Sequence, residues 1–477
     1  MGLAQHSLNI SFLAWICLYP FLLIIHRLNS YKQIIKYFFL WGVTYNLISL
    51  FWLATNIGTS IVIATLLMIL TVLYLSINFI LIGIIWFRLK SFFNNYSIII
   101  FAIVWTCIEF IKSYGLLAFP WISIANTQTD YFYLIQIAEY VGIYGVTFWI
   151  VLVNGLLFLM IENKFSKHYI LYYITIFISP FLLGCIIYNN LYEYEDDYQI
   201  SIVQPNINLK DSRDYSKKFE LLDNLLIPTK ECIDNNSKLI IWPEASLPFG
   251  TIQNDLVLNY INKKLSANKD VYILTGDSSY DNDETYNTTV LFNNEGVKKV
   301  YKKQYLVPFA EQVPLTNVFP KLKEVNVGVA SYSNGVDNVI FNIDNRRFSS
   351  LICYESTFPG INRQHVKLGV DFITFLVNDA WYITWPEPEQ HAKQSIYRAI
   401  ENRRTVLRSA NTGISLVVDP SGYVREKTNL NENTVITTFL KKTNYTTFYT
   451  KFGNVFVYIL LIILGTLFVL TFKKNEK

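Results

Sequence analysis

Three short strings in the middle of the chain carry side chains that together could perform nucleophilic catalysis. Glu244 and Cys353 each end an apolar run, and Lys303 lies in a string between them in the sequence. A carboxylate can act as a base, an ammonium can stabilise a developing anion, and a thiol can attack a carbonyl carbon. The three strings therefore predict acyl transfer through a thioester on a cysteine.

Each of the three residues has an expected role. Cys353 is the nucleophile, which reacts as the thiolate. Glu244 takes the thiol proton and later returns it, and Lys303 faces the oxygen that becomes negative. Lys302 is an alternative to Lys303, but the spacing to Leu306 favours Lys303. A lone cysteine after an apolar run is usually a small buried hydrophobe, an interpretation that the other two strings oppose.

The composition indicates a membrane protein that contains one polar segment. Of 477 residues, 52% are hydrophobic and only 16% are charged, against about 25% charged in soluble proteins. Most of the charge falls between residues 193 and 442. The net charge of +4 forms no basic stripe, so we expect no nucleic-acid partner. Five cysteines and five histidines without ligand spacing predict no disulfide framework, no metal and no cofactor.

Seven apolar runs indicate membrane helices, most of them near the roughly 20 residues that a span needs. Six precede the polar segment and one follows it: 9–26, 37–54, 60–87, 98–111, 132–160, 169–190 and 454–472. The first run lacks a basic leader and a small-residue cleavage site, so we expect a retained helix and not a signal peptide.

The loop charges predict the orientation, because basic loops stay in the cytoplasm. The first, third and fifth loops are basic, whereas residues 55–59 have no basic side chain and residues 112–131 have only Lys112. The polar segment is then extracytoplasmic and the C-terminus cytoplasmic. The basic residues are Arg27, Lys32, Lys36, Arg88, Lys90, Lys164 and Lys167 in the loops, and Lys473, Lys474 and Lys477 at the C-terminus.

Two features of the membrane segment have alternative interpretations. Glu109 lies inside an apolar run with Lys112 three residues on. An intramembrane carboxylate predicts function, but a charge pair near the helix end explains it equally well. The string Phe119-Pro120-Trp121 is either an interfacial aromatic anchor or part of a gate for lipid.

The polar segment reads as one α/β domain. Continuous apolar strands alternate with helices, which indicates a layered core. The expected helices lie at 216–225, 254–267 and 388–403; the expected strands lie at 200–205, 238–242, 271–276, 349–353 and 372–378. We expect a membrane domain over 1–192 with six transmembrane helices, a catalytic domain over 193–447, and a last transmembrane helix with a basic tail over 448–477.

The ordered strings resemble the nitrilase superfamily, with its Glu–Lys–Cys triad. With the membrane flanks and the string that runs from Leu306 to Leu315, the chain is similar to the membrane-embedded branch, the apolipoprotein N-acyltransferases. Further matching strings lie at 203–206, 285–288, 378–381, 397–404 and 408–413.

The resemblance implies a fold, a reaction and further site residues. The fold is a transmembrane helical bundle plus an α-β-β-α sandwich. The reaction moves an acyl chain from a phospholipid, through the cysteine thioester, to the amino group of diacylglyceryl-cysteine in apolipoproteins. It also implies a monomer in the bacterial inner membrane, with its catalytic domain on the periplasmic side. Glu311 is added as an essential carboxylate, and Tyr354 and Glu355 as residues that shape the site; Glu355 has a purely structural alternative.

The chain departs from the family pattern in three places. The family has eight spanning helices and we find seven runs, the absent one being the first. No tryptophan lies near Lys210-Asp211-Ser212, which puts in question a cap over the acyl chain from this loop. Trp385-Pro386 stands where the family often has Gly-Pro. His391 is given no role.

Two other functions compete with acyl transfer. A membrane-tethered nitrilase-type amidase would hydrolyse a small soluble amide and needs no groove for lipid. A non-enzymatic scaffold would bind lipid or lipoprotein and would not need the triad, yet all three triad residues are present.

Overall fold

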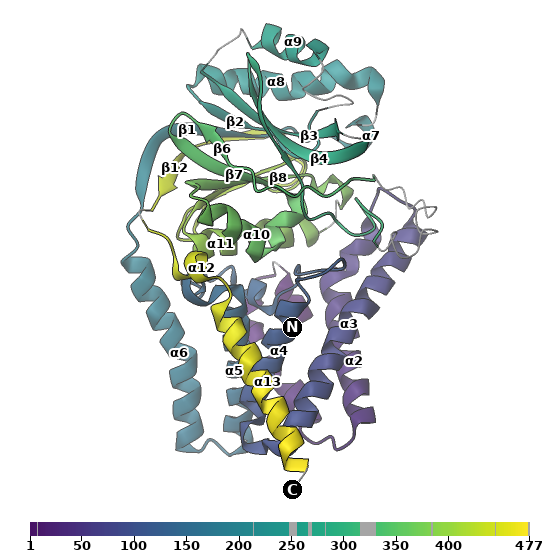
Figure 1. Ribbon diagram of the computed structural model, residues 1–477, viewed down its shortest axis with the longest axis vertical. Helices are drawn as coiled ribbons and strands as arrows, with labels where there is room; N and C mark the ends of the chain where they lie inside the picture. Colours follow the sequence, from purple (N-terminus) through teal and green to yellow (C-terminus); the bar gives the residue numbers. More distant parts are fainter. Residues whose placement is uncertain are drawn as a thin grey trace. The chain divides into compact units, whose positions relative to one another are not determined.

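Apolar runs form long helices and the polar segment forms two β-sheets in the computed structural model (Figure 1). The structure describes all residues except Ser7, Arg213, 248–254, 266–269, Asn282, 315–330, 383–384, Asn444 and 476–477. The chain divides into two compact units. The first comprises Met1–Thr55, Ile61–Leu191 and Thr447–Lys477, and the second comprises Asn56–Ser60 and Tyr192–Thr446. Lys477 of the predicted basic tail lies outside the described residues.

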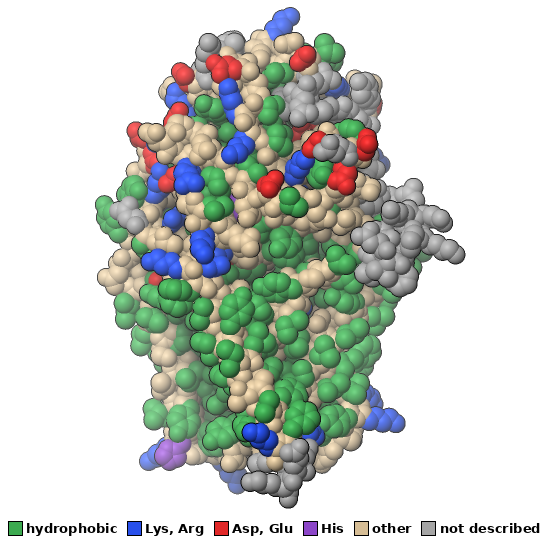
Figure 2. All heavy atoms as spheres, in the orientation of Figure 1, with side chains coloured by type: hydrophobic (Ala, Val, Ile, Leu, Met, Phe, Trp, Pro, Cys, Tyr) green, Lys and Arg blue, Asp and Glu red, His purple; other side chains and the backbone are tan. Residues whose placement is uncertain are grey.

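Within the described residues, six helices of the first unit are long and apolar enough to cross a membrane. Figure 2 shows hydrophobic side chains over these helices and charged side chains over the second unit. The six helices are α2 (Tyr31–Leu50), α3 (Ile61–Phe92), α4 (Ser97–Ile111), α5 (Ala138–Glu162), α6 (Lys167–Asn189) and α13 (Val455–Asn475).

The first apolar run differs from the long helix expected over 9–26. It forms a 3-10 helix, η2 (Ser11–Trp15), and a short helix, α1 (Tyr19–Ile25). Pro20 has no N–H and its ring clashes with the preceding turn, so one continuous helix is unfavourable. Asn154 of α5 satisfies the backbone at the break: the Leu18 N–H donates to its Oδ1 at 2.9 Å, and its Nδ2 donates to the Ala14 carbonyl at 2.8 Å.

The second unit contains two six-stranded sheets. Its first sheet has the order β12-β1-β2-β3-β4-β5 and its second has the order β11-β10-β9-β8-β7-β6. In the first sheet the strands are β12 (Thr434–Lys442), β1 (Tyr194–Gln204), β2 (Leu239–Ile241), β3 (Tyr272–Asp281), β4 (Glu284–Asn293) and β5 (Gly296–Lys302). In the second they are β11 (Val424–Lys427), β10 (Leu416–Val418), β9 (Thr405–Ala410), β8 (Phe372–Val377), β7 (Arg346–Ile352) and β6 (Phe341–Ile343).

Helices cover the outer faces of the two sheets. α8 (Lys218–Asp234) and α9 (Asp255–Lys264) pack on the first sheet, where apolar side chains such as Leu225 and Val257 surround Trp242. α10 (Pro359–Lys367) and α11 (Glu387–Asn402) pack on the second. Because β1 contacts β9 and β4 contacts β7, the sheets face each other. This arrangement confirms the predicted α-β-β-α sandwich (Figure 1). Smaller helices are α7 (Leu209–Ser212) and, in the first unit, α12 (Phe448–Phe452).

The parallel strands position the candidate residues. β1, β2 and β3 are parallel neighbours, as are β7, β8 and β9. Glu244 follows β2, Cys353 follows β7 and Asn378 follows β8, each within three residues of the strand's carboxyl end. Parallel strands end at one edge of their sheet, so these side chains converge where the two sheets meet.

Candidate active site

The structure brings Glu244, Lys303 and Cys353 together in a buried site. The Lys303 ammonium lies 3.4 Å from Glu244 Oε1, and the two side chains are almost completely buried, at 1% and 8% exposure. Cys353 lies close enough to Glu244 and Lys303 for both charges to act on its thiol. A base, a cation and a thiol are therefore within reach of one another, the arrangement that nucleophilic acyl chemistry needs.

Two further side chains complete the charge network. Glu311 Oε1 accepts from the Lys303 ammonium at 2.8 Å, and its Oε2 accepts from the Val307 N–H at 2.8 Å. Asn287 on β4 donates to Glu244 Oε1 and to Glu311 Oε1, each at 2.8 Å. The amide of Asn287 thus joins two carboxylates that also share one ammonium. Lys302 points elsewhere, to Asp281 at 2.8 Å.

Backbone contacts fix the position of Glu244. The Asn378 N–H donates to Glu244 Oε2 at 3.0 Å, which links the base to the end of β8 in the other sheet. Gly276 of β3 packs directly beneath the turn: an added Cβ would lie 2.5 Å from the Glu244 Cα. Glycine is therefore the residue that lets the backbone approach this closely.

Cys353 sits in a strained turn at the end of β7. Its φ is +49°, in the left-handed region that residues with a Cβ seldom adopt. The turn continues as the 3-10 helix η8 (Cys353–Thr357). Such strain costs about 1–3 kcal/mol and persists only where surrounding contacts enforce it.

Glu355 supplies one of those contacts. Its Oε2 accepts from the Ile352 N–H at 2.8 Å, and its Oε1 accepts from the Tyr301 hydroxyl and the Gln304 N–H, both at 2.7 Å. The carboxylate therefore ties the cysteine turn to the segment that carries Lys303. Tyr354 is buried, with its ring 5.0 Å from that of Phe358. The hydrogen bonds of Glu355 go to Tyr301 and to backbone N–H groups, which favours a structural role for this carboxylate.

Burial and charge set the proton positions. Burial raises the pKa of Glu244, and Lys303 lowers it without reversing the direction. Burial and Glu244 likewise raise the pKa of the Cys353 thiol. Burial lowers the pKa of Lys303, but Glu311 and Glu244 more than offset this and raise it. The resting site therefore holds a neutral thiol beside a firmly protonated lysine.

One group of the described side chains has the donor set of a metal site. Ligand atoms of Asp379, Glu387 and His391 all lie within 4.8 Å of one another. However, the Arg408 guanidinium already pairs with Asp379 Oδ2 at 2.9 Å. A second cation in the same buried space would be repelled, so these residues do not fit a metal ion well.

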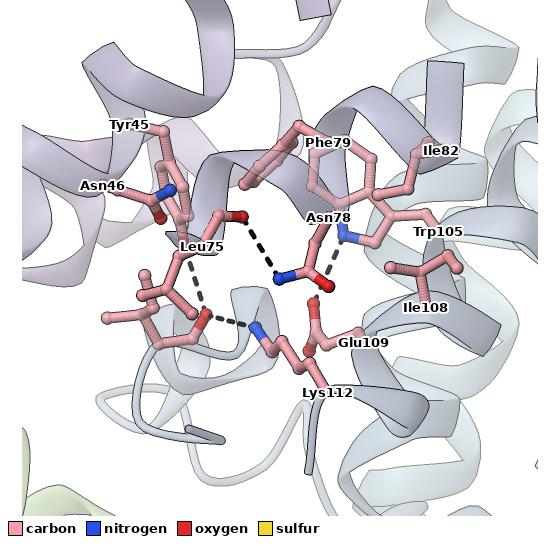
Figure 3. A pocket seen from close by; sticks show the side chains of 11 residues that line it. Tyr45, Asn46, Leu75, Asn78, Phe79, Ile82, Trp105, Ile108, Glu109 and Lys112 are labelled. Atoms are coloured by element: carbon pink, nitrogen blue, oxygen red, sulfur yellow. Dashed lines mark hydrogen bonds between the residues drawn. The ribbon is translucent and has the colours of Figure 1, made fainter. Parts of the chain in front are cut away.

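The first unit holds a separate, mostly apolar pocket into which polar side chains such as Glu109 and Lys112 also project (Figure 3). Glu109 accepts there from Trp105 Nε1 at 3.2 Å, from Thr147 Oγ1 at 2.8 Å and from the Ser123 hydroxyl. Lys112 donates to the Ile122 carbonyl at 3.3 Å. Neutral donors thus satisfy Glu109, and the described residues record no ion pair between it and Lys112. Trp121 is buried beside Trp52, with ring centroids 5.3 Å apart, which does not suit an exposed anchor.

Sequence reasoning gave no role to several residues around the site. Asn287, Asn378 and Asp379 lie in strings that match the family, which was the available signal, but the contacts they make were not readable from the strings. His391 carried no such signal, although it is 1% exposed and lies within hydrogen-bonding distance of the Cys353 carbonyl.

Comparisons with known proteins match both units. Residues 1–156 match the family model of the apolipoprotein N-acyltransferase N-terminal domain, and residues 199–446 match that of carbon-nitrogen hydrolase. An apolipoprotein N-acyltransferase of Rickettsia prowazekii is 30% identical over 90% of this chain and 88% of its own length. One of Chlorobaculum tepidum is 27% identical over 95% and 91%. Among solved structures, Nit3 of Saccharomyces cerevisiae, a nitrilase-superfamily member, is 18% identical, with a TM-score of 0.39, over 51% of this chain and 89% of that one.

Proposed function

Because the chain belongs to the apolipoprotein N-acyltransferase family, we propose that it acylates the N-terminal amino group of diacylglyceryl-cysteine in apolipoproteins, with a membrane phospholipid as donor. The observation that carries the proposal is the buried contact between Glu244 and Lys303 beside the Cys353 thiol. We also propose that the protein acts as a monomer, in which Glu311 completes the site.

The first step forms the thioester. Glu244 takes the proton from the Cys353 thiol, and the sulfur attacks the ester carbonyl of the phospholipid. Lys303 stabilises the oxygen that becomes negative. The carbonyl–oxygen bond to glycerol then breaks, Glu244 returns the proton to the leaving oxygen, and lysophospholipid departs.

The second step forms the amide. The free α-amino group of the lipoprotein attacks the thioester carbonyl and gives up a proton to Glu244. The carbon–sulfur bond breaks, and the sulfur receives the proton back from Glu244. Both steps use the same base and the same cation, so the enzyme ends in the state in which it began.

Both substrates are lipids, which explains why the catalytic unit is part of a membrane protein. Each CH₂ group exposed to water costs about 0.8 kcal/mol, so neither substrate leaves the bilayer unaided. We place the protein in the bacterial inner membrane with the second unit in the periplasm, as the loop charges predict.

The amidase alternative is not favoured. A soluble amide would need only the carbon-nitrogen hydrolase unit, whereas this chain also matches the N-acyltransferase N-terminal domain over residues 1–156. The fate of the thioester distinguishes the two activities. In an amidase the thioester is hydrolysed by water, whereas in a transferase it persists until an amine is added.

The proposal predicts an acyl adduct on Cys353. Protein purified into phospholipid vesicles should gain the mass of one fatty acyl chain on the peptide that carries Cys353, as read by mass spectrometry. Addition of a diacylated lipopeptide should discharge it to give the triacylated product.

Cys353→Ala should abolish both the adduct and the product, because it removes the sulfur that forms the thioester. Cys232→Ala is the matched control, since Cys232 is a second cysteine of the same unit and is buried in its apolar core. An unmodified Cys353 in active wild-type protein would exclude this mechanism.

A further inference from the structure

Two buried residues that take no part in these steps connect to the nucleophile. Asp379 lies in the 3-10 helix η9 (Asp379–Trp381) after β8, and His391 lies on α11. His391 Nδ1 is 2.8 Å from Asp379 Oδ1, and its Nε2 is 3.1 Å from the carbonyl oxygen of Cys353. Nε2 also lies 3.2 Å from the Ser356 hydroxyl oxygen. Both ring nitrogens face oxygen acceptors, so the protonated imidazole donates to the carboxylate and to the backbone of the nucleophile. Burial and Arg408 lower the pKa of this ring, whereas Asp379 raises it.

A hydrogen bond to the Cys353 carbonyl affects the backbone conformation of the nucleophile. The residue has φ +49°, and only a fixed peptide orientation on each side keeps it there. The Ser356 hydroxyl donates to the same carbonyl at 2.8 Å. With a proton on Nε2, His391 and Ser356 both donate to this one oxygen, and the direction of the Cys353 side chain depends on the backbone angles that they stabilise.

Asp379 is itself held in place. The Arg408 Nη2 donates to its Oδ2 at 2.9 Å, and Arg408 is fully buried. Gly413 packs so closely that an added Cβ would collide with the same oxygen. The preceding residue, Asn378, holds Glu244 through its N–H. One turn after β8 therefore reaches both the base and, through His391, the nucleophile.

We propose that Asp379 and His391 are positioning residues, which lock the Cys353 backbone in its left-handed conformation and so aim the thiol at Glu244. Arg408 anchors the pair from behind. The inference rests on the proposed function for what the thiol attacks, but the orientation of the thiol is a property of the resting protein.

A pair of substitutions at His391 tests the proposal. Glutamine places an amide nitrogen near the position of Nε2 and keeps a donor for the Cys353 carbonyl. Asparagine is shorter and places one near Nδ1, so it keeps only the contact to Asp379. H391Q should acylate Cys353 within about threefold of wild type, and H391N should be slower by roughly 10- to 100-fold, the effect of one lost buried hydrogen bond.

A second readout does not depend on lipid. The rate at which iodoacetamide alkylates Cys353, followed on its peptide by mass spectrometry, should fall in H391N and stay near wild type in H391Q. His365 provides the matched control: it is fully buried on α10, and neither ring nitrogen has a hydrogen-bond partner among the described residues. H365Q and H365N should therefore not differ from each other in alkylation rate.

The outcomes are distinct. Equal losses in H391Q and H391N that follow their loss of thermal stability would overturn the proposal, because the ring would then only fill space. If H391N does not fold, Ser356→Ala removes the other donor to the same carbonyl, and an unchanged alkylation rate would overturn it as well. If H391N is alkylated more slowly than H391Q but wild type forms no acyl adduct, the positioning role is supported and the proposed function is rejected.

Discussion

Glu244, Lys303 and Cys353 form a site whose resting charges oppose the formation of a free thiolate. Burial raises the pKa of both Glu244 and the Cys353 thiol, whereas Lys303 lowers both. A buried thiolate would also face the neighbouring carboxylates. In the proposed mechanism the sulfur therefore becomes anionic only as it attacks, when the proton moves to Glu244 and the negative charge moves to the substrate oxygen beside Lys303.

The raised pKa of Glu244 predicts a pH dependence. A base works only when ionised, so thioester formation should slow as the pH falls through this pKa, at a pH above the value of about 4.3 for an exposed glutamate. Asn287→Ala removes a hydrogen bond that lowers this pKa, so its acidic limb should shift to higher pH. Its rate at neutral pH should fall by about 10- to 100-fold, since a hydrogen bond to a charged group contributes roughly 1.5–3 kcal/mol.

The measurement is the initial rate of Cys353 acylation across pH. Asn293→Ala is the control on the same strand, because Asn293 accepts from the Glu295 N–H at the other end of β4. If Asn287→Ala leaves the pH profile unchanged, the Asn287 amide does not lower the pKa of Glu244.

At the residue scale the sequence indicated the candidate reactive groups better than the residues that support them. Glu244, Lys303 and Cys353, which the structure brings together, could be selected because a base, a cation and a thiol end or follow recognisable runs. Asn287 and Asn378 could not be given roles, because they meet Glu244 across 43 and 134 residues of chain. Those contacts depend on strand pairing and on the stacking of two sheets, which no local pattern encodes.

At the scale of elements, the site lies where the ends of several strands come close together. The tightest approach is between β3 and the turn after β2, where Gly276 faces the backbone of Glu244 and Ala245. The strands with nearly continuous apolar runs, such as β2 and β8, could be predicted from sequence. The prediction of one long helix over 9–26 was wrong. Asn154, far along the chain, accepts a hydrogen bond from the Leu18 N–H and so stabilises the break there.

Gly276→Ala tests the close approach. The new methyl would meet the Glu244 Cα at 2.5 Å, and such overpacking costs about 1–3 kcal/mol of folding free energy. Because the shift moves the base itself, acylation of Cys353 should fall by at least about tenfold. Thermal unfolding and adduct formation measure the two effects.

Gly360→Ala on α10 is the control, since an added Cβ there meets no atom within 4 Å. It should keep full activity and stability, as alanine is the better helix former. Wild-type behaviour of Gly276→Ala would mean that the turn has room that the structure does not show.

At the scale of the whole molecule, the six long apolar helices identify a membrane protein. The basic side chains near the helix ends are unevenly distributed, with Arg88 and Lys90 at the end of α3 and Lys164 and Lys167 between α5 and α6. This asymmetry predicts which loops remain in the cytoplasm. Composition alone could predict this level of organisation, because hydrophobic length and charge are local properties of the sequence.

A topology reporter tests the orientation. Fused between α3 and α4, near residues 93–96, it should report the cytoplasm; fused in the segment 113–118 after α4, it should report the periplasm. Loss of Arg88 and Lys90 should weaken this preference. A reversed pair of readings would place the second unit in the cytoplasm and contradict the proposed access to exported lipoproteins.

The contacts of Glu311 have a consequence for the choice of acceptor. Two acids share a single ammonium there, so with Glu244 ionised the hollow around the sulfur has an excess negative charge. In the proposed reaction a cationic lipoprotein amino terminus would be attracted to this charge, and it would lose one proton to solvent before it attacks and gives the next to Glu244. A water molecule gains no such attraction, so the charge of the proposed site favours the amine over water as the acceptor of the fatty chain.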